Sequence, residues 1–359
     1  MEIKMVDLHG QYLRIKPEID SAIQSVMDST AFIQGKEVQE FATALSKFAG
    51  GAYVVPCANG TDALQIAMMA LGLKPGEEVI LPVHTYVATA EVIALLGLTP
   101  VFVDVDADTF NIDVDKIERV MTKKTKAIVP VHLYGQCADM DQLMDIASKH
   151  NIRVIEDAAQ SIGAKYKGRF SGTIGDVGTT SFFPSKNLGC FGDGGAIFTR
   201  SADLAEEMRV IANHGQKKKY HHERIGVNSR LDTIQAAILN VKLRYLHEYE
   251  KKRNKVANYY DEHLNGVTIP VRAKNSTHVF HQYTIKVQRR DALKEHLASR
   301  NIPTMIYYPV PLHRQKAYFQ DTCFPVTEQL SGSVLSLPIH TEMTEEQLDY
   351  ICRSVNELR

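Results

Sequence analysis

The sequence lacks an excess of charge of either sign and a long hydrophobic run. Its 359 residues include 41 Lys and Arg against 42 Asp and Glu, which gives a formal net charge of -1. Such a balance creates no overall field that would attract nucleic acid or an anionic membrane. No run of about 18 apolar residues is present, as a membrane-spanning helix would need. We therefore expect neither nucleic acid nor a membrane among the partners.

Paired cysteine motifs are also missing. The chain has five cysteines, scattered without a CxxC spacing, so neither a zinc site nor a disulfide framework is expected and no residue is predicted to bind a metal. The first residues, MEIKMVDLHGQYLRIKPEID, carry too many charges for a signal peptide. These features together predict a soluble protein of the reducing cytoplasm.

Short apolar runs alternate with amphipathic stretches from about residue 52 onward. The apolar runs are AYVVP, EEVILPV, PVFVDVD, KAIVPV and IRVIED, and the stretches between them are ALQIAMMALGL, ATAEVIALLGL, VDKIERVM and MDQLMDIASKH. Short buried runs separated by segments of helix length indicate parallel strands with crossover helices. We therefore predict an α/β fold whose mostly parallel sheet is covered by helices on both faces.

The pattern changes in residues 231–264, a long helical stretch that loses apolar density after Tyr245. Beyond it, FHQYTIKV alternates as a strand does, while RRDALKEHLASRNI and EEQLDYICRSVNELR have the periodicity of helices. We expect two domains: an N-terminal segment with a large domain over residues 1–247, and a small C-terminal α+β domain over residues 248–359.

Polar residues close several of the predicted strands. Asp157 ends IRVIED, and Asn59, Gly60 and Thr61 follow AYVVPC. Ligands of α/β sheets collect at the carboxyl ends of strands, where a turn into a helix presents free backbone N–H groups to a phosphate. Helix capping by Asn59 would explain the same turn, and Asp157 could be a cap or an ion-pair partner. The turn has neither GxxxxGK nor GxGxxG spacing, so a nucleoside triphosphate site is not expected.

Lys186 lies in SFFPSKNLGCFGDGGAIFT, between an apolar run and a loop of small residues. Such a setting suggests a partly buried amine rather than a solvated one. An isolated amine, a carboxylate and an anion-binding turn are the three attachments that pyridoxal 5'-phosphate requires. Lys186 would condense with its aldehyde, Asp157 would pair with its ring nitrogen, and the turn would hold its phosphate. Tyr86 could stack on the ring or belong to the core.

Six motifs in this order resemble the DegT/DnrJ/EryC1/StrS family of nucleotide-sugar aminotransferases: NGTDAL, HTYVATAEVIALLG, VIEDAAQSIGA, SFFPSKNLGCFGDGGAIFT, NHGQ and GVNSRLDTIQAAIL. The resemblance covers nearly the whole chain. It implies a fold-type I aminotransferase with a seven-stranded type of sheet, and a homodimer whose active sites lie at the subunit interface. It also implies the cofactor pyridoxal 5'-phosphate.

The resemblance assigns a role to each matching residue. Lys186 resembles the Schiff-base lysine, Asp157 the partner of the pyridinium and Gln160 a neighbour of the ring hydroxyl. Tyr86 resembles the stacking residue. The remaining matches are the phosphate contacts Gly60, Thr61 and Ser181, and Asn228, the asparagine that reaches in from the other subunit. From the residues alone, Asn228 could instead cap the helix that starts near Arg230. Asp193 in FGDGGA could be a turn residue or a contact, and we leave it out of the catalytic set.

Within the family, ANGTDALQI, LYGQCAD and YHHERIGVNSRLD run close to the 3-aminotransferases for UDP-2-acetamido-2-deoxy-3-oxo-glucuronate. Those enzymes serve O-antigen and other polysaccharide pathways, with L-glutamate as the usual amino donor. Arg230 could bind a substrate carboxylate by a bidentate pair or form a structural ion pair. The basic run KKKYHHER, residues 217–224, could hold the nucleotide diphosphate or be a solvated loop.

One departure from this subgroup concerns Tyr307 and Tyr308, which stand before Pro309 where the subgroup tends to have His-Tyr-Pro. The resemblance places these residues at the sugar. A 3-aminotransferase for a dTDP-3-oxo-6-deoxyhexose is therefore the alternative, followed by an enzyme for a 4-keto sugar. From another class, a regulator that binds the cofactor without turnover stays open.

Overall fold

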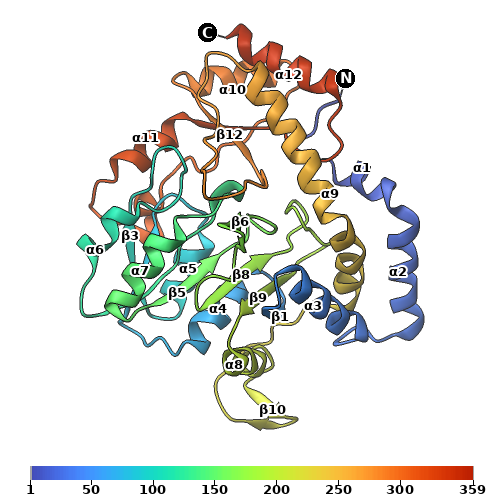
Figure 1. Ribbon diagram of the computed structural model, residues 1–359, viewed down its shortest axis with the longest axis vertical. Helices are drawn as coiled ribbons and strands as arrows, with labels where there is room; N and C mark the ends of the chain where they lie inside the picture. Colours follow the sequence, from blue (N-terminus) through green and yellow to red (C-terminus); the bar gives the residue numbers. More distant parts are fainter. Residues whose placement is uncertain (1, 359) are drawn as a thin grey trace.

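The computed structural model describes residues 2–358, and a seven-stranded sheet forms its centre (Figure 1). The strands are β1 (Tyr53–Cys57), β2 (Glu78–Pro82), β3 (Thr99–Val103), β4 (Thr125–Ile128), β5 (Arg153–Asp157), β8 (Val177–Ser181) and β9 (Gly195–Thr199). They lie in the order β1, β9, β8, β5, β4, β2, β3. Only β9 runs antiparallel to its neighbours, and all other pairs are parallel. The predicted α/β class and mostly parallel sheet are confirmed.

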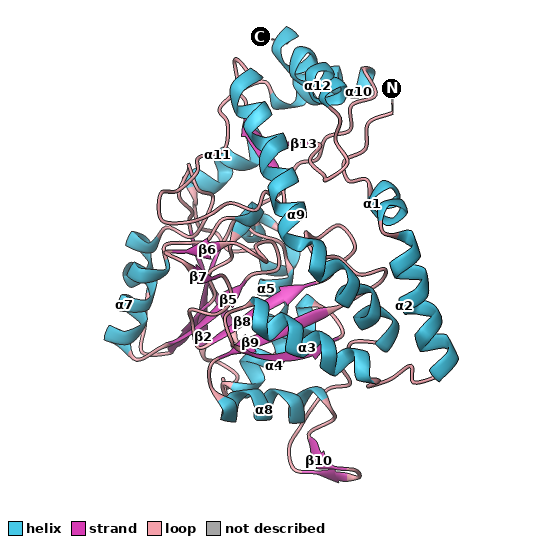
Figure 2. Ribbon diagram, turned by 45° about the vertical axis from the view of Figure 1, so that its right-hand side comes forward, coloured by secondary structure: helices cyan, strands magenta, loops and turns pink. Residues whose placement is uncertain are grey.

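Helices cover the sheet on both faces, as Figure 2 shows. They are α3 (Lys36–Phe48), α4 (Gly60–Ala70), α5 (Ala88–Leu95), α7 (Met140–His150) and α8 (Ala202–Ala212). Successive strand residues point to opposite faces. Val79 and Leu81 of β2 therefore pack in the hydrophobic cluster that includes α4, α5 and α8, while Ile80 packs in the cluster that includes α7. This explains why the strands read as continuous apolar runs rather than as alternating ones.

The crossover predicted at VDKIERVM is shorter than a regular helix. It consists of the 3-10 turn η1 (Val114–Lys116) and the single turn α6 (Ile117–Val120). Asp113 caps η1 by accepting from the backbone N–H of Asp115, and Met121 already has an extended backbone. The expectation of a full crossover helix there was wrong, because the helical backbone ends after one turn at Val120.

The long helix α9 (Thr233–His263) forms as expected and joins two hydrophobic clusters. Ala236, Leu239 and Leu246 pack with α3 and β9, while Val256 and Tyr260 pack with the C-terminal part of the chain. Within the described residues, no helix has both the length and the apolar character needed to cross a membrane.

The C-terminal part is built around the antiparallel pair β12 (Tyr283–Lys286) and β13 (Val334–Leu337). It also contains α10 (Arg290–Ser299), α11 (Pro325–Ser333), α12 (Glu345–Glu357) and the 3-10 turns η3 (Leu312–Arg314) and η4 (Lys316–Tyr318). Ile3, from the start of the chain, belongs to the same hydrophobic cluster as α10 and α12. The division into domains at residues 247 and 248 falls inside α9 and stays a prediction.

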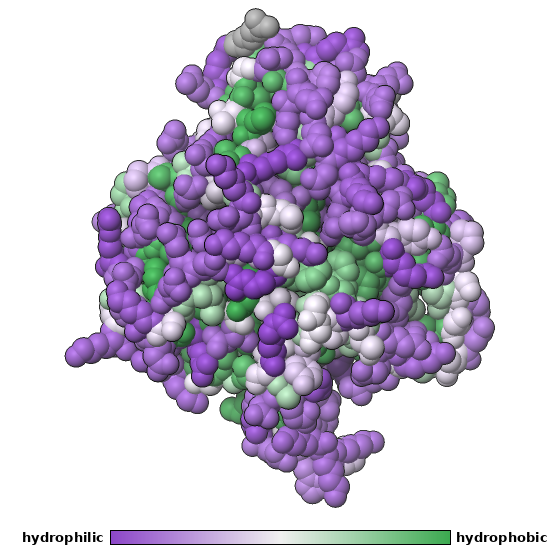
Figure 3. Space-filling model, in the orientation of Figure 1, coloured by the Kyte–Doolittle hydropathy of each residue, from purple (hydrophilic) through white to green (hydrophobic). Residues whose placement is uncertain are grey.

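Three smaller features complete the fold. The helices α1 (Leu8–Arg14) and α2 (Lys16–Ser29) precede the seven-stranded sheet in the sequence, and α2 lies along α9 (Figures 1 and 2). The short strands β6 (Lys165–Tyr166) and β7 (Arg169–Phe170) pair with each other. The hairpin of β10 (Gln216–Lys218) and β11 (His221–His222) projects from the bottom of Figure 1, and its surface is hydrophilic in Figure 3. The basic run 217–224 is exposed along its length, as a solvated loop would be.

Candidate active site

A cavity of about 660 Å³ opens at the carboxyl ends of β1, β2, β5 and β8. Its wall brings together most of the residues that the sequence singled out: Gly60, Thr61, Tyr86, Asp157, Gln160, Ser181, Lys186, Tyr307 and Tyr308. The first seven come from the part of the chain that builds the seven-stranded sheet, and the two tyrosines come from the loop after α10. The topology thus gathers these side chains at one site. Their individual roles stay predictions.

Lys186 lies in the irregular segment between β8 and β9, and its backbone N–H donates to the carbonyl of Phe183 at 2.8 Å. The side chain is half-buried on the cavity wall. Burial lowers the pKa of the Lys186 amine to about 8, and the negative charge of Asp157 acts in the opposite direction. A lysine needs this kind of desolvation to become a nucleophile near neutral pH.

We expect the apoenzyme to take up pyridoxal 5'-phosphate faster as pH rises through about 8. Only the neutral amine attacks an aldehyde, and a lysine with an ordinary pKa of about 10.4 would still be protonated there. The measurement is the rate of absorbance change between about pH 6 and pH 10. The same titration of n-butylamine with free cofactor corrects for the ionisation of the cofactor. A corrected rate that rises without levelling up to about pH 10 would contradict the lowered pKa.

Asp157 is the last residue of β5 and is 7% exposed. Its backbone is fixed on both sides, because its N–H donates to Pro130 at 2.9 Å and its carbonyl accepts from the N–H of His132 at 3.0 Å. The carboxylate accepts from the Thr89 hydroxyl at 2.9 Å and from the backbone N–H of Ala159 at 3.1 Å. Asp157 is therefore neither a helix cap nor part of a surface ion pair, and its carboxylate is held in one orientation at the cavity.

The turn after β1 leads directly into α4, which starts at Gly60. Asn59 is the N-cap, and its side-chain oxygen accepts from the backbone N–H of Asp62 at 2.8 Å. A Cβ atom built at Gly60 would lie 2.8 Å from the Cβ of Ser181, so only glycine lets the start of α4 approach the end of β8 so closely. The capping interpretation of Asn59 is correct, and it leaves the N–H groups at the helix start beside Ser181, an arrangement suited to phosphate.

Gln160 links two parts of the cavity wall. Its side-chain oxygen accepts from the backbone N–H of Tyr134 at 2.8 Å, and its amide nitrogen donates to the Tyr308 hydroxyl at 3.1 Å. The Tyr86 ring is 58% exposed and lies 6.2 Å from the Tyr308 ring, centre to centre. Because Tyr86 is not buried, it is no core residue, and its ring is accessible for stacking.

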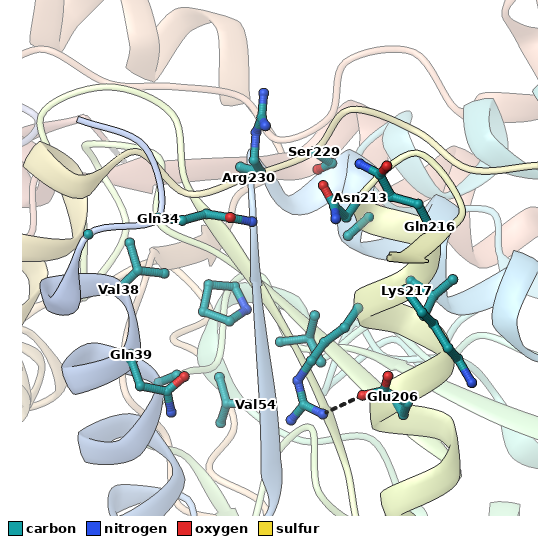
Figure 4. Close-up of a pocket in the computed structure, with 17 residues that line it drawn as sticks. Gln34, Val38, Gln39, Val54, Glu206, Asn213, Gln216, Lys217, Ser229 and Arg230 are labelled. Carbon is teal, nitrogen blue, oxygen red and sulfur yellow. Dashed lines mark hydrogen bonds and ion pairs between the residues drawn. The ribbon is translucent and has the colours of Figure 1, made fainter. Parts of the chain in front are cut away.

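Asn228 and Arg230 do not line this cavity. They line an adjoining pocket with Ile33, and that pocket shares Asp193 with the cavity. Arg230 also borders a third pocket of about 390 Å³, where Figure 4 shows it beside Ser229. The N-cap interpretation of Asn228 was wrong, because α9 starts at Thr233 and Asp232 stands at its N-cap position, without a capping hydrogen bond from its side chain.

The cavity also contains residues that sequence reasoning did not assign. Asp193 lies on its wall, although a turn role had kept it out of the site. His281 and Gln282 reach the wall from the segment before β12. No local motif marks these two residues, because only the packing of the C-terminal part against η2 (Leu133–Gly135) brings them to the strand ends.

These residues fit pyridoxal 5'-phosphate. Lys186 offers an amine with a lowered pKa, Asp157 a fixed carboxylate, and the turn at Gly60 a close approach of backbone N–H groups that a Cβ would block. The sequence pattern of the DegT/DnrJ/EryC1/StrS aminotransferase family matches residues 13–356. The chain belongs to this family.

Relatives of this aminotransferase and solved structures of similar proteins agree with the assignment. The chain is 49% identical to a UDP-2-acetamido-2-deoxy-3-oxo-D-glucuronate aminotransferase of Pseudomonas aeruginosa, over 98% of this chain and 99% of the relative. It is 44% identical to a dTDP-3-amino-3,6-dideoxy-alpha-D-galactopyranose transaminase of Aneurinibacillus thermoaerophilus, over 99% of each. A crystal structure of a DegT DnrJ EryC1 StrS aminotransferase from Brucella abortus superposes with a TM-score of 0.96 at 41% identity, covering 99% of each chain.

The cofactor follows from the same comparisons. NtdA of Bacillus subtilis, solved with bound pyridoxamine phosphate, has a TM-score of 0.89 at 33% identity, over 94% of this chain and 80% of that one. The aminotransferase described here uses pyridoxal 5'-phosphate. When bound, this group supplies an aldehyde that carries the amino group and a ring that withdraws electrons from the reacting carbon.

Proposed function

We propose that this aminotransferase transfers the amino group of L-glutamate to C3 of UDP-2-acetamido-2-deoxy-3-oxo-glucuronate. The observation that carries the chemistry is the presence of Lys186 and Asp157 in one cavity. The substrate is inferred from the Pseudomonas aeruginosa relative, whose name states it. The aminated sugar would enter a bacterial polysaccharide such as the O-antigen of lipopolysaccharide.

Lys186 serves both halves of the reaction in this proposal. Its amine removes the proton from the amine-bearing carbon of glutamate and later delivers a proton to C3 of the sugar. A pKa of about 8 suits both steps, because the group then changes its protonation state easily near neutral pH. Asp157 holds the charge that keeps the ring nitrogen protonated.

The charge of the cavity supports a homodimer. Among the described residues on its wall, Lys186 is the one cation, whereas Asp62, Asp157 and Asp193 carry carboxylates. Glutamate and a uronate each bring a further carboxylate, which requires a cation close by. We propose that a second copy of the chain brings Arg230, together with Asn228, to this cavity.

Replacing Arg230 by alanine is expected to raise the KM for the uronate about a hundredfold, because a bidentate pair of charged hydrogen bonds is lost. The KM for a dTDP-3-oxo-6-deoxyhexose, which has no carboxylate, should change far less. The assay scores the gain of an amine by mass spectrometry over a panel of UDP- and dTDP-linked keto sugars, each at several concentrations. Glutamate is kept saturating, so that a loss of donor binding does not mask the result.

Arg209→Ala is the matched control, because Arg209 borders the same pocket of about 390 Å³ as Arg230 but pairs with Glu206 at 3.5 Å. This variant should keep the wild-type KM. An equal effect of Arg230→Ala on charged and uncharged sugars would contradict the uronate proposal.

Mixing the variants Lys186→Ala and Arg230→Ala tests the shared site. If Lys186 of one copy works with Arg230 of the other, a mixed dimer has one fully intact site. Random mixing should then restore about a quarter of the wild-type activity at low uronate concentration, because half of the dimers are mixed. Activity no higher than the average of the two variants would contradict a site shared between copies.

The alternative substrate is a dTDP-3-oxo-6-deoxyhexose. It is favoured by Tyr307, an uncharged side chain on the cavity wall where the uronate subgroup tends to have His, and by the identity with the Aneurinibacillus thermoaerophilus relative. The panel of keto sugars separates the two substrates directly.

We also propose that the enzyme works in the cytoplasm. All five cysteines are free thiols, and Cys57, Cys137, Cys190 and Cys352 are buried. Free thiols are typical of a reducing compartment.

A further inference from the structure

Tyr134 has an unusual backbone conformation for a large residue. It lies in η2 with φ 57° and ψ 0°, and its side chain is only 2% exposed. This left-handed region is unfavourable for a residue with a Cβ atom, and it persists only where the surrounding contacts hold it. The contacts of Tyr134 therefore identify what the conformation is needed for.

Each polar group of Tyr134 reaches a different segment of the cavity wall. Its backbone N–H donates to the side-chain oxygen of Gln160 at 2.8 Å, and its carbonyl accepts from the N–H of Gln282 at 3.2 Å. Its hydroxyl donates to the backbone carbonyl of Tyr307. His84, at the end of β2, places Nε2 3.3 Å from the same hydroxyl. One residue thus joins the strand ends to both segments that the C-terminal part contributes.

The network continues to Tyr308. Gln160, held by Tyr134, donates to the Tyr308 hydroxyl at 3.1 Å, and the Tyr308 ring packs edge-on against His84 with 6.1 Å between centres. Burial lowers the pKa of His84 to about 4, so the imidazole is neutral at physiological pH and can donate from Nε2 to the Tyr134 oxygen. Tyr307 and Tyr308 are therefore held through their backbone, their hydroxyl and their ring.

We propose that Tyr134 is a positioning residue that holds Tyr307 and Tyr308 in place for the nucleotide sugar. Tyr134 is not itself on the cavity wall, so it acts through Gln160 and the Tyr307 carbonyl. The inference rests on the proposed function, because it assigns Tyr307 and Tyr308 to the sugar and not to glutamate.

The test is Tyr134→Phe, which removes the hydroxyl and keeps the ring and the backbone. Each half-reaction is followed alone by the absorbance change of the holoenzyme from its pyridoxal to its pyridoxamine form. The probes are L-glutamate and UDP-2-acetamido-3-amino-2,3-dideoxy-glucuronate, the aminated sugar. The half-saturating concentration of the sugar should rise about tenfold, the typical effect of losing one buried hydrogen bond. That of glutamate should change by less than about twofold.

Tyr260→Phe is the matched control. Tyr260 is fully buried, and its hydroxyl donates to the carbonyl of Pro338 at 2.8 Å, in the cluster that packs α9 on α12. The same atom is removed from the same kind of bond, away from the cavity. This variant should leave both half-reactions unchanged even if its melting temperature falls.

Hydrogen exchange of the holoenzyme provides a second measurement. Residues 303–311 should exchange faster in Tyr134→Phe than in the wild type, and Tyr260→Phe should leave them unchanged. Equal effects of Tyr134→Phe on glutamate and sugar, no effect on the sugar, or unchanged exchange at residues 303–311 would each overturn the proposal. If the wild type responds to glutamate but to no amino sugar, the proposed substrate fails, while the exchange result still decides the role of Tyr134.

Discussion

Lys186→Ala is expected to abolish transamination, with kcat lower by about 10⁴-fold or more, because in the proposed mechanism this one side chain supplies both the nucleophile and the acid–base group. The amine stands alone in this role: among the described residues on the cavity wall no other lysine is present. Borohydride reduction of the wild-type holoenzyme should leave a pyridoxyl adduct on the peptide that contains residue 186. The variant should give no such adduct, even where it binds the cofactor reversibly.

Lys242→Ala is the matched control for this result. Lys242 is a fully buried lysine, and burial lowers its pKa to about 8, as it does for Lys186. Lys242 lies in α9, away from the cavity wall, and its amine donates to the carbonyl of Gly189. This variant should lose stability but keep the adduct on Lys186. An adduct found on Lys242 in the wild type would contradict the assignment of Lys186.

The sheet and the centre of the site could be predicted because their signals are local. Asp157 ends an apolar run and Gly60 follows one, and parallel strands bring their carboxyl ends to one edge, whereas Ser181 was related to the phosphate only by the resemblance to the family. Lys186 was recognisable because a lysine between Pro184 and a run of small residues is not in the usual setting of a solvated charge. Local pattern and topology therefore agree at these positions.

Other parts of the site depend on contacts between distant segments. Tyr134 contacts Tyr307, which is far from it in the sequence. Neither the left-handed backbone of Tyr134 nor its hydrogen bonds leave a pattern in the sequence. Asn228 and Arg230 lie outside the cavity of a single chain, so only the resemblance to a family related Asn228 to the cofactor and Arg230 to the substrate.

The second half of α9 shows a further limit of pattern reading. Its apolar density falls after Tyr245, yet Tyr249 and Arg253 are buried. Arg253 donates to the carbonyls of Phe280 at 2.9 Å and Ile339 at 3.1 Å. Buried cations that bind backbone carbonyls keep a polar signature in the sequence, so hydrophobic periodicity alone does not detect them.

Asp157→Asn is expected to lower kcat by about 10³-fold while the adduct on Lys186 still forms. The substitution keeps the shape of the side chain, so that its oxygen can accept from the N–H of Ala159 while its amide nitrogen donates to the Thr89 hydroxyl, but it removes the charge that we propose beside the ring nitrogen. Opposite charges about 4 Å apart attract by about 4 kcal/mol at an effective dielectric of about 20, which corresponds to the stated loss if the ring becomes neutral. The measurement is the rate of the glutamate half-reaction by absorbance, together with borohydride trapping.

Asp193→Asn tests whether the effect of Asp157→Asn comes from a local pair between Asp157 and the ring nitrogen or from the overall negative charge of the cavity. It removes the same charge from the same wall, but from the side that adjoins the pocket of Asn228 and Arg230. Its effect on the glutamate half-reaction should stay below about tenfold, since charges that remain solvated interact weakly. If both variants slowed the reaction equally, the requirement would be for negative charge anywhere in the cavity, and Asp157 would not be the partner of the ring nitrogen. If only Asp157→Asn slows the reaction and its adduct still forms, the carboxylate is not needed for the cofactor to bind. It then acts in the later step, in which Lys186 removes a proton from the reacting carbon.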